Sequence, residues 1–234
     1  MNKKNINFIV IEGPDGSGKA TQTKLLIKAL KKQGLKIKKI DFPQYGKKSA
    51  GMVEEYLNGK YGNSEKVGPY RASIFYACDR YDASFKIKKW LKDGYTVVSD
   101  RYISSNVAHQ GGKIENRNKR KDYIKWLYDL EYNIFEIPKP DITLILKTST
   151  DFSYKLSSSI KDKEKKDKKA LYLGKKKRDI HEKDKKHLKN SLDSYLELSK
   201  ERPNEFKVVE CIENKKLLSP NDIHNKVKKI LKII

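Results

Sequence analysis

A short segment near the N-terminus combines the residue types and spacing that bind phosphate. Gly13 to Lys19 has the sequence GPDGSGK, which fits the pattern G-x-x-x-x-G-K. In that pattern, backbone N–H groups surround phosphate oxygens and the lysine reaches the terminal ones. The segment lies between an apolar run and a stretch of helical spacing, so the positive end of a helix would add to the anion site. We therefore predict that this loop binds phosphate groups.

The residue after Lys19 departs from the usual form of this loop. Ala20 stands where Ser or Thr normally supplies a hydroxyl to Mg²⁺, and Thr21 is one residue out of register. Mg²⁺ takes oxygen ligands and keeps several waters. We expect the ion to be held by phosphate oxygens, waters and a carboxylate, with Asp15 and Asp100 as the candidates.

Arginine is rare in this chain, which makes its positions informative. Only 7 of the 53 basic residues are arginine. Arg101 follows Asp100 at the end of an apolar run, and Arg80 stands four residues after Tyr76, so that Arg80 and Tyr76 would share one helix face. A planar, permanently charged fork of donors makes two-point contacts with ligands such as phosphates. Because lysine is used almost everywhere else, an arginine at a binding site would suggest that this geometry matters there.

The elements that would position these residues alternate along the chain. Apolar and β-branched runs predict five strands, at 7–11, 37–41, 96–99, 142–146 and 206–211. Helices are predicted from Lys19 to Gly34, after Pro69 as far as Gly94, at 122–134, at 179–199 and from Asn221. This alternation predicts an α/β fold, a five-stranded parallel sheet with helices on both faces, whose ligands bind at the carboxyl ends of the strands. The length of 234 residues predicts a single domain spanning 1–234.

The chain carries 53 basic and 30 acidic side chains, a net charge of +23. One explanation is a polyanionic partner, either nucleic acid or an anionic membrane. The other is an AT-rich coding sequence, because Lys, Ile and Asn are abundant while Arg is rare. We favour the second explanation, coding-sequence composition, and expect no specific nucleic-acid partner and no membrane partner. Residues 161–189 hold fourteen basic and six acidic residues, so we expect a solvated, mobile insertion there.

Neither a membrane span nor a signal peptide is expected. The uncharged run from Asn5 to Ile11 is short and ends at Glu12. Cys78 and Cys211 have no ligand-like spacing with the four histidines, and we expect both to be reduced thiols. These features predict a cytoplasmic protein.

Several segments together resemble one family, the thymidylate kinases, within the nucleoside-monophosphate kinases. The segments are 13–22 (GPDGSGKATQ), 42–46 (FPQYG), 76–80 (YACDR), 100–102 (DRY) with 104–110 (SSNVAHQ), and 178–182 (RDIHE). The resemblance implies a P-loop kinase fold with a mobile lid. It implies ATP-dependent, Mg²⁺-assisted phosphorylation of dTMP to dTDP. It also implies a homodimer, formed through helices that flank the sheet.

The resemblance assigns ATP binding to the phosphate loop and a catalytic role to Lys19, Asp15, Arg101 and Arg178. Arg101 would hold the phosphate of the acceptor, and Asp15 would bond the deoxyribose 3′-OH. Arg178 would bring positive charge to the transferring phosphoryl group from a lid at about 155–180. No general base is needed, because the acceptor phosphate is already ionised. The ATP-binding candidates are Gly13, Pro14, Asp15, Gly16, Ser17, Gly18, Lys19, Ala20 and Thr21.

The resemblance also implies a pocket for the base and the sugar. Tyr76, or the preceding Phe75, would stack on the base, and Phe42 would line its methyl side; core packing is the alternative for all three. His109 stands where the family usually has an aromatic residue against the sugar, and a surface histidine is the alternative there. The substrate-binding candidates are Asp15, Phe42, Tyr45, Tyr76, Arg80, Arg101, Ser105, Asn106, His109, Asp179 and Glu182.

Two other functions stay open from the sequence. Another deoxynucleoside or nucleotide kinase would share the phosphate loop and could also carry an Asp-Arg pair, but the Phe42-Pro43 and 76–80 segments argue against it. A basic nucleic-acid-binding module with a degenerate nucleotide site would account for the net charge and the lysine-rich insertion.

Overall fold

The computed structural model describes residues 6–158 and 185–233. At its centre lies a parallel sheet with the strand order β2-β3-β1-β4-β5. The strands are β1 (Phe8–Glu12), β2 (Ile37–Asp41), β3 (Thr96–Asp100), β4 (Ile142–Lys147) and β5 (Phe206–Glu210). The predicted α/β fold with a five-stranded parallel sheet is confirmed, and each predicted strand ends within one residue of the observed one.

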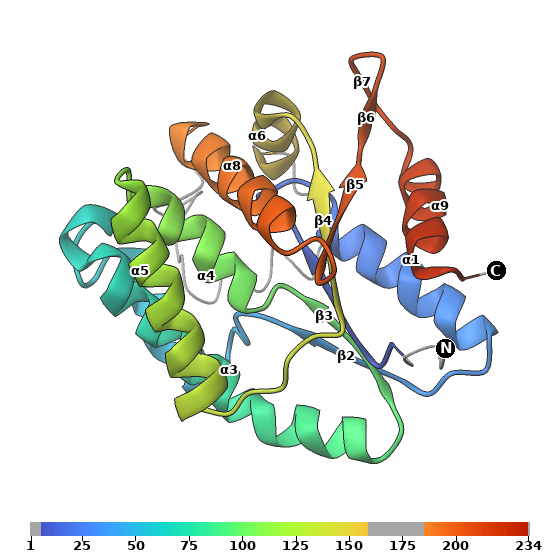
Figure 1. Cartoon of the computed structure of the whole chain (residues 1–234), viewed down its shortest axis with the longest axis horizontal. Coiled ribbons are helices and arrows are strands. Elements are labelled where there is room, and N and C mark those ends of the chain that lie inside the picture. Colours follow the sequence, from blue (N-terminus) through green and yellow to red (C-terminus); the bar gives the residue numbers. More distant parts are fainter. Residues whose placement is uncertain (1–5, 159–184, 234) are drawn as a thin grey trace.

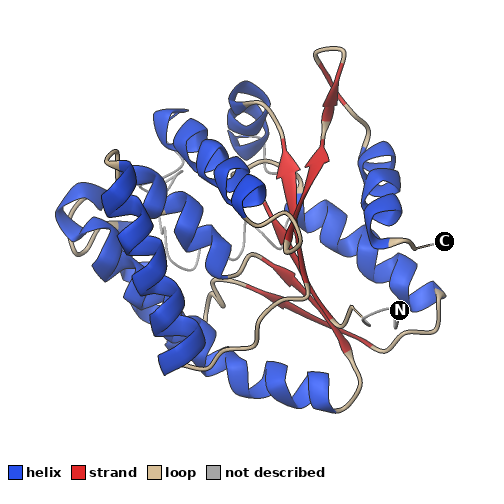
Figure 2. Cartoon of the chain, in the orientation of Figure 1, coloured by secondary structure: helices blue, strands red, loops and turns tan. Residues whose placement is uncertain are grey.

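Helices cover both faces of the sheet, which explains why the central strands β1, β3 and β4 are buried along almost their whole length (Figure 2). Side chains alternate along β1, so Phe8 and Val10 face one hydrophobic cluster while Ile9 and Ile11 face the other. In Figure 1, α1 and α9 lie to one side of the sheet and α3, α4, α5 and α8 to the other. Their bounds are α1 (Lys19–Lys32), α9 (Pro220–Leu231), α3 (Ser64–Lys92), α4 (Ile103–His109), α5 (Arg117–Tyr128) and α8 (Lys185–Glu201).

The helix beginnings follow from local capping. Asn116 accepts a hydrogen bond from the N–H of Lys119, so α5 begins before the predicted residue 122. Its continuation over Asp129–Ile134 is the π-helical turn η3. Gly68 has a φ of 74° and a ψ of 165° and divides α3, so the long helix continues from Pro69, as predicted. The first part of the predicted helix at 179–199 lies outside the described residues.

Several elements have no counterpart among the predicted ones. The most important is α4, whose sequence ISSNVAH holds β-branched and small polar residues that favour helix only weakly. Tertiary contacts stabilise so short a helix. The others are η1 (Lys48–Ala50), α2 (Gly51–Asn58), η2 (Gly111–Lys113), α6 (Thr150–Ser158) and the hairpin of β6 (Ile212–Glu213) and β7 (Lys216–Leu217).

The described residues bear on two further predictions, the lid and the membrane span. Helix α6 occupies the start of the lid predicted at about 155–180, and the rest of that lid lies outside the described residues. Across the described ranges 6–158 and 185–233, no helix has both the length and the apolar character needed to cross a membrane.

Candidate active site

The predicted phosphate loop joins the carboxyl end of β1 to the first turn of α1. Gly13 has a φ of 144°, and a Cβ there would lie 2.7 Å from Ser17 Oγ and 2.9 Å from the carbonyl oxygen of Leu146. Gly18, at the N-cap of α1, has a φ of 91° and no side chain to cap the helix. The first N–H groups of α1 can therefore serve an anion, and this loop fits phosphate groups.

Lys19 is folded over this loop. Its Nζ donates hydrogen bonds of 2.9 Å to the carbonyl oxygens of both Gly13 and Pro14, and the side chain is buried. A lysine held above the amides of a phosphate loop is in place to exchange carbonyl contacts for phosphate oxygens. Its role in binding ATP stays a prediction.

Arg101 joins three other predicted substrate residues into one cluster. Its Nη2 donates to Oδ1 of Asp15 in the phosphate loop. Its Nη1 donates to Ser105 Oγ at 3.2 Å and lies 3.0 Å from Nε2 of His109. The guanidinium therefore lies between the phosphate loop and α4, at the carboxyl end of β3, where parallel sheets bind ligands.

His109 is neutral in this arrangement. A guanidinium has only donors, so Nε2 of His109 accepts from Arg101 and the ring proton lies on Nδ1. Nδ1 is 3.2 Å from Nε2 of His187 and 3.2 Å from Oγ of Ser191, both on α8. Burial, reinforced by the charge of Arg101, holds the pKa of His109 well below its ordinary value. His109 is thus a buried partner of Arg101, and the surface alternative does not hold.

Glu12 is a central residue of this cluster that the sequence analysis missed. It ends β1, directly before Gly13, and its side chain is 0% exposed. Its carboxylate accepts hydrogen bonds from four groups: the N–H of Tyr102, just before α4, the hydroxyls of Ser104 and Ser105 on α4, and the hydroxyl of Tyr195 on α8. An acidic residue ending an apolar strand beside a phosphate loop was the signal that could have identified it.

Arg80 forms a buried ion pair that the sequence analysis also missed. Its Nε and Nη2 donate to the two carboxylate oxygens of Glu131 at 2.6 and 2.7 Å. The two side chains are 1% and 0% exposed. Glu131 lies in the π-helical turn η3, and such turns occur frequently at functional sites. Arg80 is thus oriented by Glu131, and its contact with a base stays a prediction.

The aromatic candidates lie in two places. Phe42 is buried against Tyr102, with ring centroids 5.6 Å apart. Tyr76 and Phe75 both contact Tyr56 of α2 edge-on, at 6.3 and 6.1 Å. Tyr45 packs on the same cluster as a half-buried residue. All four rings therefore have packing partners, and their contact with a nucleotide stays a prediction.

Asn106 is fixed by the protein rather than open to a ligand in this structure. Its Nδ2 donates to the backbone carbonyl oxygen of Ser73 on α3 at 3.2 Å, and the backbone carbonyl oxygen of Asn106 accepts from the hydroxyl of Tyr123 at 3.2 Å. Three further candidates, Arg178, Asp179 and Glu182, lie outside the described residues.

The two carboxylates predicted to hold Mg²⁺ flank Arg101. Asp15 accepts from its guanidinium, and Asp100 precedes it in the chain with a buried side chain. No three His, Cys, Asp or Glu side chains cluster as a metal site within the described part of the chain. Mg²⁺ is usually bound through one or two carboxylates together with substrate phosphates. Asp15 and Asp100 fit that donor set. Their binding of Mg²⁺ stays a prediction.

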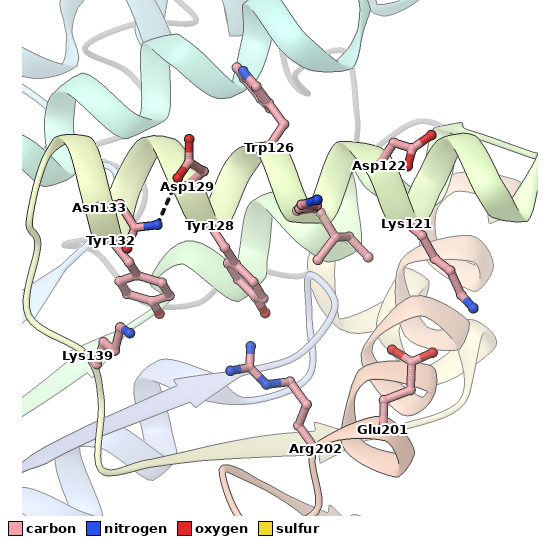
Figure 3. A pocket seen from close by; sticks show the side chains of 12 residues that line it. Lys121, Asp122, Trp126, Tyr128, Asp129, Tyr132, Asn133, Lys139, Glu201 and Arg202 are labelled. Atoms are coloured by element: carbon pink, nitrogen blue, oxygen red, sulfur yellow. Dashed lines mark hydrogen bonds between the residues drawn. The ribbon is translucent and has the colours of Figure 1, made fainter.

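A separate cavity of about 930 Å³ lies away from this cluster, between α5, η3 and the end of α8 (Figure 3). The rings of Tyr128 and Tyr132 lie side by side in it, 5.5 Å apart. Arg202 stacks on Tyr128 at 4.9 Å, and Lys139 lies 5.0 Å from the ring centre of Tyr132. Lys139 and Arg202 precede β4 and β5, so this cavity is at the amino ends of those strands, opposite the phosphate loop.

The phosphate loop lies between β1 and α1 of a β2-β3-β1-β4-β5 parallel sheet, and an arginine from the neighbouring strand contacts it. A loop of this kind at the switch point of such a sheet cradles the phosphates of a nucleotide. The protein is thus a P-loop phosphotransferase of the nucleotide kinase type.

Comparison with known proteins narrows this class. A family model described as thymidylate kinase matches residues 11–221. The thymidylate kinase of Mycobacterium tuberculosis is 29% identical over 147 residues, which cover 62% of this chain and 68% of that protein. A probable thymidylate kinase of Thermococcus onnurineus is 32% identical over 226 residues, covering 94% of each chain.

The fold has a solved counterpart as well. A structure of thymidylate kinase from Candida albicans matches with a TM-score of 0.70 and 22% identity, over 97% of this chain and 91% of that one. This chain belongs to the thymidylate kinase family, as the resemblance of its motifs indicated. It is a phosphotransferase with thymidylate kinase activity.

Proposed function

We propose that this protein transfers the γ-phosphoryl group of ATP to the phosphate of dTMP, and that the two nucleotides meet at Arg101. The hydrogen bond from Arg101 to Asp15 supports this proposal most directly. It brings a cation suited to the acceptor phosphate into contact with the loop that would hold the donor phosphates. Adjacent donor and acceptor sites are what an in-line transfer requires.

The proposed reaction needs positioning and charge rather than a protein base. An oxygen of the dTMP phosphate forms a bond to the γ-phosphorus as the bond from that phosphorus to the bridging oxygen of ADP breaks. Lys19, next to the loop carbonyls, would stabilise the donor phosphates, and Arg101 the acceptor phosphate. Mg²⁺, when bound near Asp15 and Asp100, would neutralise charge on the phosphates. Arg178 would add a further cation from the lid.

The proposed base pocket lies between α3, α4 and the segment after β2. Arg80 would read the base while Glu131 holds two of its nitrogens, and Asn106 would exchange its contact with Ser73 for the base edge. Tyr76 or Phe75 would stack on the base, with Phe42 on its methyl side. Ser105 and His109 both lie on α4 and contact Arg101, and they would act on the acceptor nucleotide through that arginine.

We also propose a homodimer through α3. Tyr70, Ile74, Tyr81 and Phe85 are large apolar residues exposed along one stripe of this helix, with Phe85 60% exposed. A contiguous exposed apolar stripe marks an interaction surface. Cys78, also exposed, lies near the middle of the stripe. Two copies packed antiparallel about a two-fold axis would cover both stripes.

The test of the activity is ATP consumption with a panel of acceptors. We expect turnover with dTMP and much weaker turnover with dCMP, dGMP and UMP. Equal rates with all four acceptors would reject the proposed base pocket. Omitting Mg²⁺ and adding a chelator should abolish turnover, and full activity without the ion would reject its proposed role.

A further inference from the structure

Glu12 collects hydrogen bonds from parts of the chain that are far apart in sequence. Oε1 accepts from the N–H of Tyr102 at 2.8 Å and from Ser104 Oγ at 2.9 Å. Oε2 accepts from Ser105 Oγ and from the hydroxyl of Tyr195, each at 2.7 Å. Four donors around one fully buried side chain match the acceptor capacity of a carboxylate. The group is therefore built into the fold and is not a solvated charge.

The direction of these bonds connects Glu12 to Arg101. A guanidinium can only donate, so Ser105 Oγ accepts from Nη1 of Arg101 at 3.2 Å. The single hydroxyl proton of Ser105 is thereby directed to Oε2 of Glu12. The result is a chain of donors that runs from Arg101 through Ser105 to Glu12, and its polarity is fixed by the two charged ends.

The backbone gives a second connection between the same two residues. Arg101 has a φ of 71°, a left-handed conformation that is strained for a non-glycine residue. It persists because the polar groups around it are held: its N–H donates to Ile11, its carbonyl accepts from Ser99 Oγ, and the next N–H, of Tyr102, donates to Glu12. Glu12 thus fixes the turn from which the Arg101 side chain leaves β3.

We propose that Glu12 is the positioning residue of Arg101: it sets both the backbone turn and, through Ser105, the orientation of the guanidinium. Tyr195 of α8 anchors the carboxylate from the other side. This inference rests on the proposed role of Arg101 in holding the acceptor phosphate. Glu12 itself is completely buried and needs no contact with either nucleotide.

Glu12→Gln tests the proposal, because it keeps the size of the side chain but replaces one acceptor oxygen with a donor. The N–H of Tyr102 requires an acceptor, so the new amide nitrogen must face Ser105 and Tyr195 and disrupt the chain to Arg101. We expect KM for dTMP to rise or kcat to fall so that kcat/KM for dTMP drops on the order of tenfold to a hundredfold. KM for ATP should change less than twofold.

A double-mutant cycle separates positioning from a general effect on folding. In the Arg101→Ala background, Glu12→Gln should change kcat/KM for dTMP by less than twofold, because its target is gone. If instead the loss in the double variant is the product of the two single losses, Glu12 does not act through Arg101 and the proposal is overturned. If Arg101→Ala alone left the kinetics unchanged, the proposed role of Arg101 would fail instead.

Ser104 and Ser105 supply a matched pair that keeps the test decisive if Glu12→Gln does not fold. Both hydroxyls donate to Glu12, but only Ser105 also contacts Arg101. Ser105→Ala should reproduce part of the loss in kcat/KM for dTMP, while Ser104→Ala should lower it by a clearly smaller factor. Equal effects of the two substitutions, with equal melting temperatures, would overturn the proposal.

Discussion

Arg101 donates a hydrogen bond to Asp15 across 86 positions of sequence and so joins the strand β3 to the phosphate loop. The contact puts the one arginine of the DRY segment beside the amides that would cradle the donor phosphates. It also leaves the guanidinium with three partners, Asp15, Ser105 and His109, that fix its plane.

Arg101→Lys should therefore be severe although the charge is kept. A lysine cannot serve three partners with one planar fork. We expect kcat/KM for dTMP to fall by about 10²-fold or more, measured in a coupled assay of ADP formation. Arg202→Lys, in the remote cavity, is the matched control and should stay within twofold of the native enzyme. Near-native activity of Arg101→Lys would show that the fork is not needed.

Lys19→Met should lower kcat by about 10²- to 10³-fold, the usual effect of removing one preorganised charge from a transition state. The methionine keeps the length of the side chain but cannot contact phosphate. Lys24→Met, on an exposed position of the same helix, is the control and should be neutral. If both substitutions had the same effect on kcat, the loop would not be the donor site.

Removing only one member of the buried Arg80–Glu131 pair should destabilise the fold more than replacing both. Glu131→Gln leaves a buried guanidinium without its counter-charge, and we expect the free energy of unfolding to fall by about 3–5 kcal/mol. The double replacement Arg80→Met with Glu131→Leu should recover much of that loss. The exposed pair Lys89–Asp93 is the control, since its removal should cost about 1 kcal/mol or less. Denaturant titration measures all three, and equal losses for the buried and the exposed pair would contradict the expectation.

Stability should fall at mildly acidic pH because of His109. Its folded-state pKa lies well below the ordinary value, chiefly through burial and then through Arg101. Below about pH 6.5 the unfolded chain binds a proton that the folded protein does not, so the free energy of unfolding decreases as pH falls, by at most about 1.4 kcal/mol per unit. Burial lowers the pKa of Lys113 to about 7, so the titration of this lysine affects stability at higher pH than that of His109.

Unfolding measured at pH 7.5, 6.5 and 5.5 tests this expectation. His109→Gln keeps an acceptor for Arg101 but cannot titrate, so its stability should depend less steeply on pH than that of the native protein. His224→Gln is the comparison: burial also lowers the pKa of this less buried histidine, and its removal should reduce the pH dependence less than His109→Gln does. Identical pH dependence in the native protein and in His109→Gln would refute the assignment.

Cys78 makes the proposed dimer testable by cross-linking. Because it lies near the middle of the α3 stripe, antiparallel packing brings the two copies of this thiol together across the two-fold axis. Mild oxidation should give a disulfide-linked dimer, and Cys78→Ser should abolish it; Cys211, which is buried, should not react. Phe85→Glu should shift the native protein to monomer in light scattering. A native protein that is monomeric at micromolar concentration would contradict the proposal.

Local sequence signals were sufficient for the framework. Local patterns placed five strands to within one residue, most clearly the central strands β1 and β4, which are buried on both faces and apolar along nearly their whole length. The spacing of Gly13, Gly18 and Lys19 identified the loop, because the positive φ of both glycines and the lack of a Cβ at Gly13 are properties of glycine itself. Helix α4 had no such signal, because its stability comes from contacts with other elements.

What the sequence alone determined is therefore everything whose physical cause lies within a few residues: the strands, the capped helices, the phosphate loop and the prominence of a few arginines. Only the tertiary structure decided which partners those arginines have. Glu12 meets Tyr195 across 183 positions, and Arg80 meets Glu131 across 51. A buried charge needs a partner wherever the fold can supply one, and the choice among many carboxylates follows from how the sheet and helices pack.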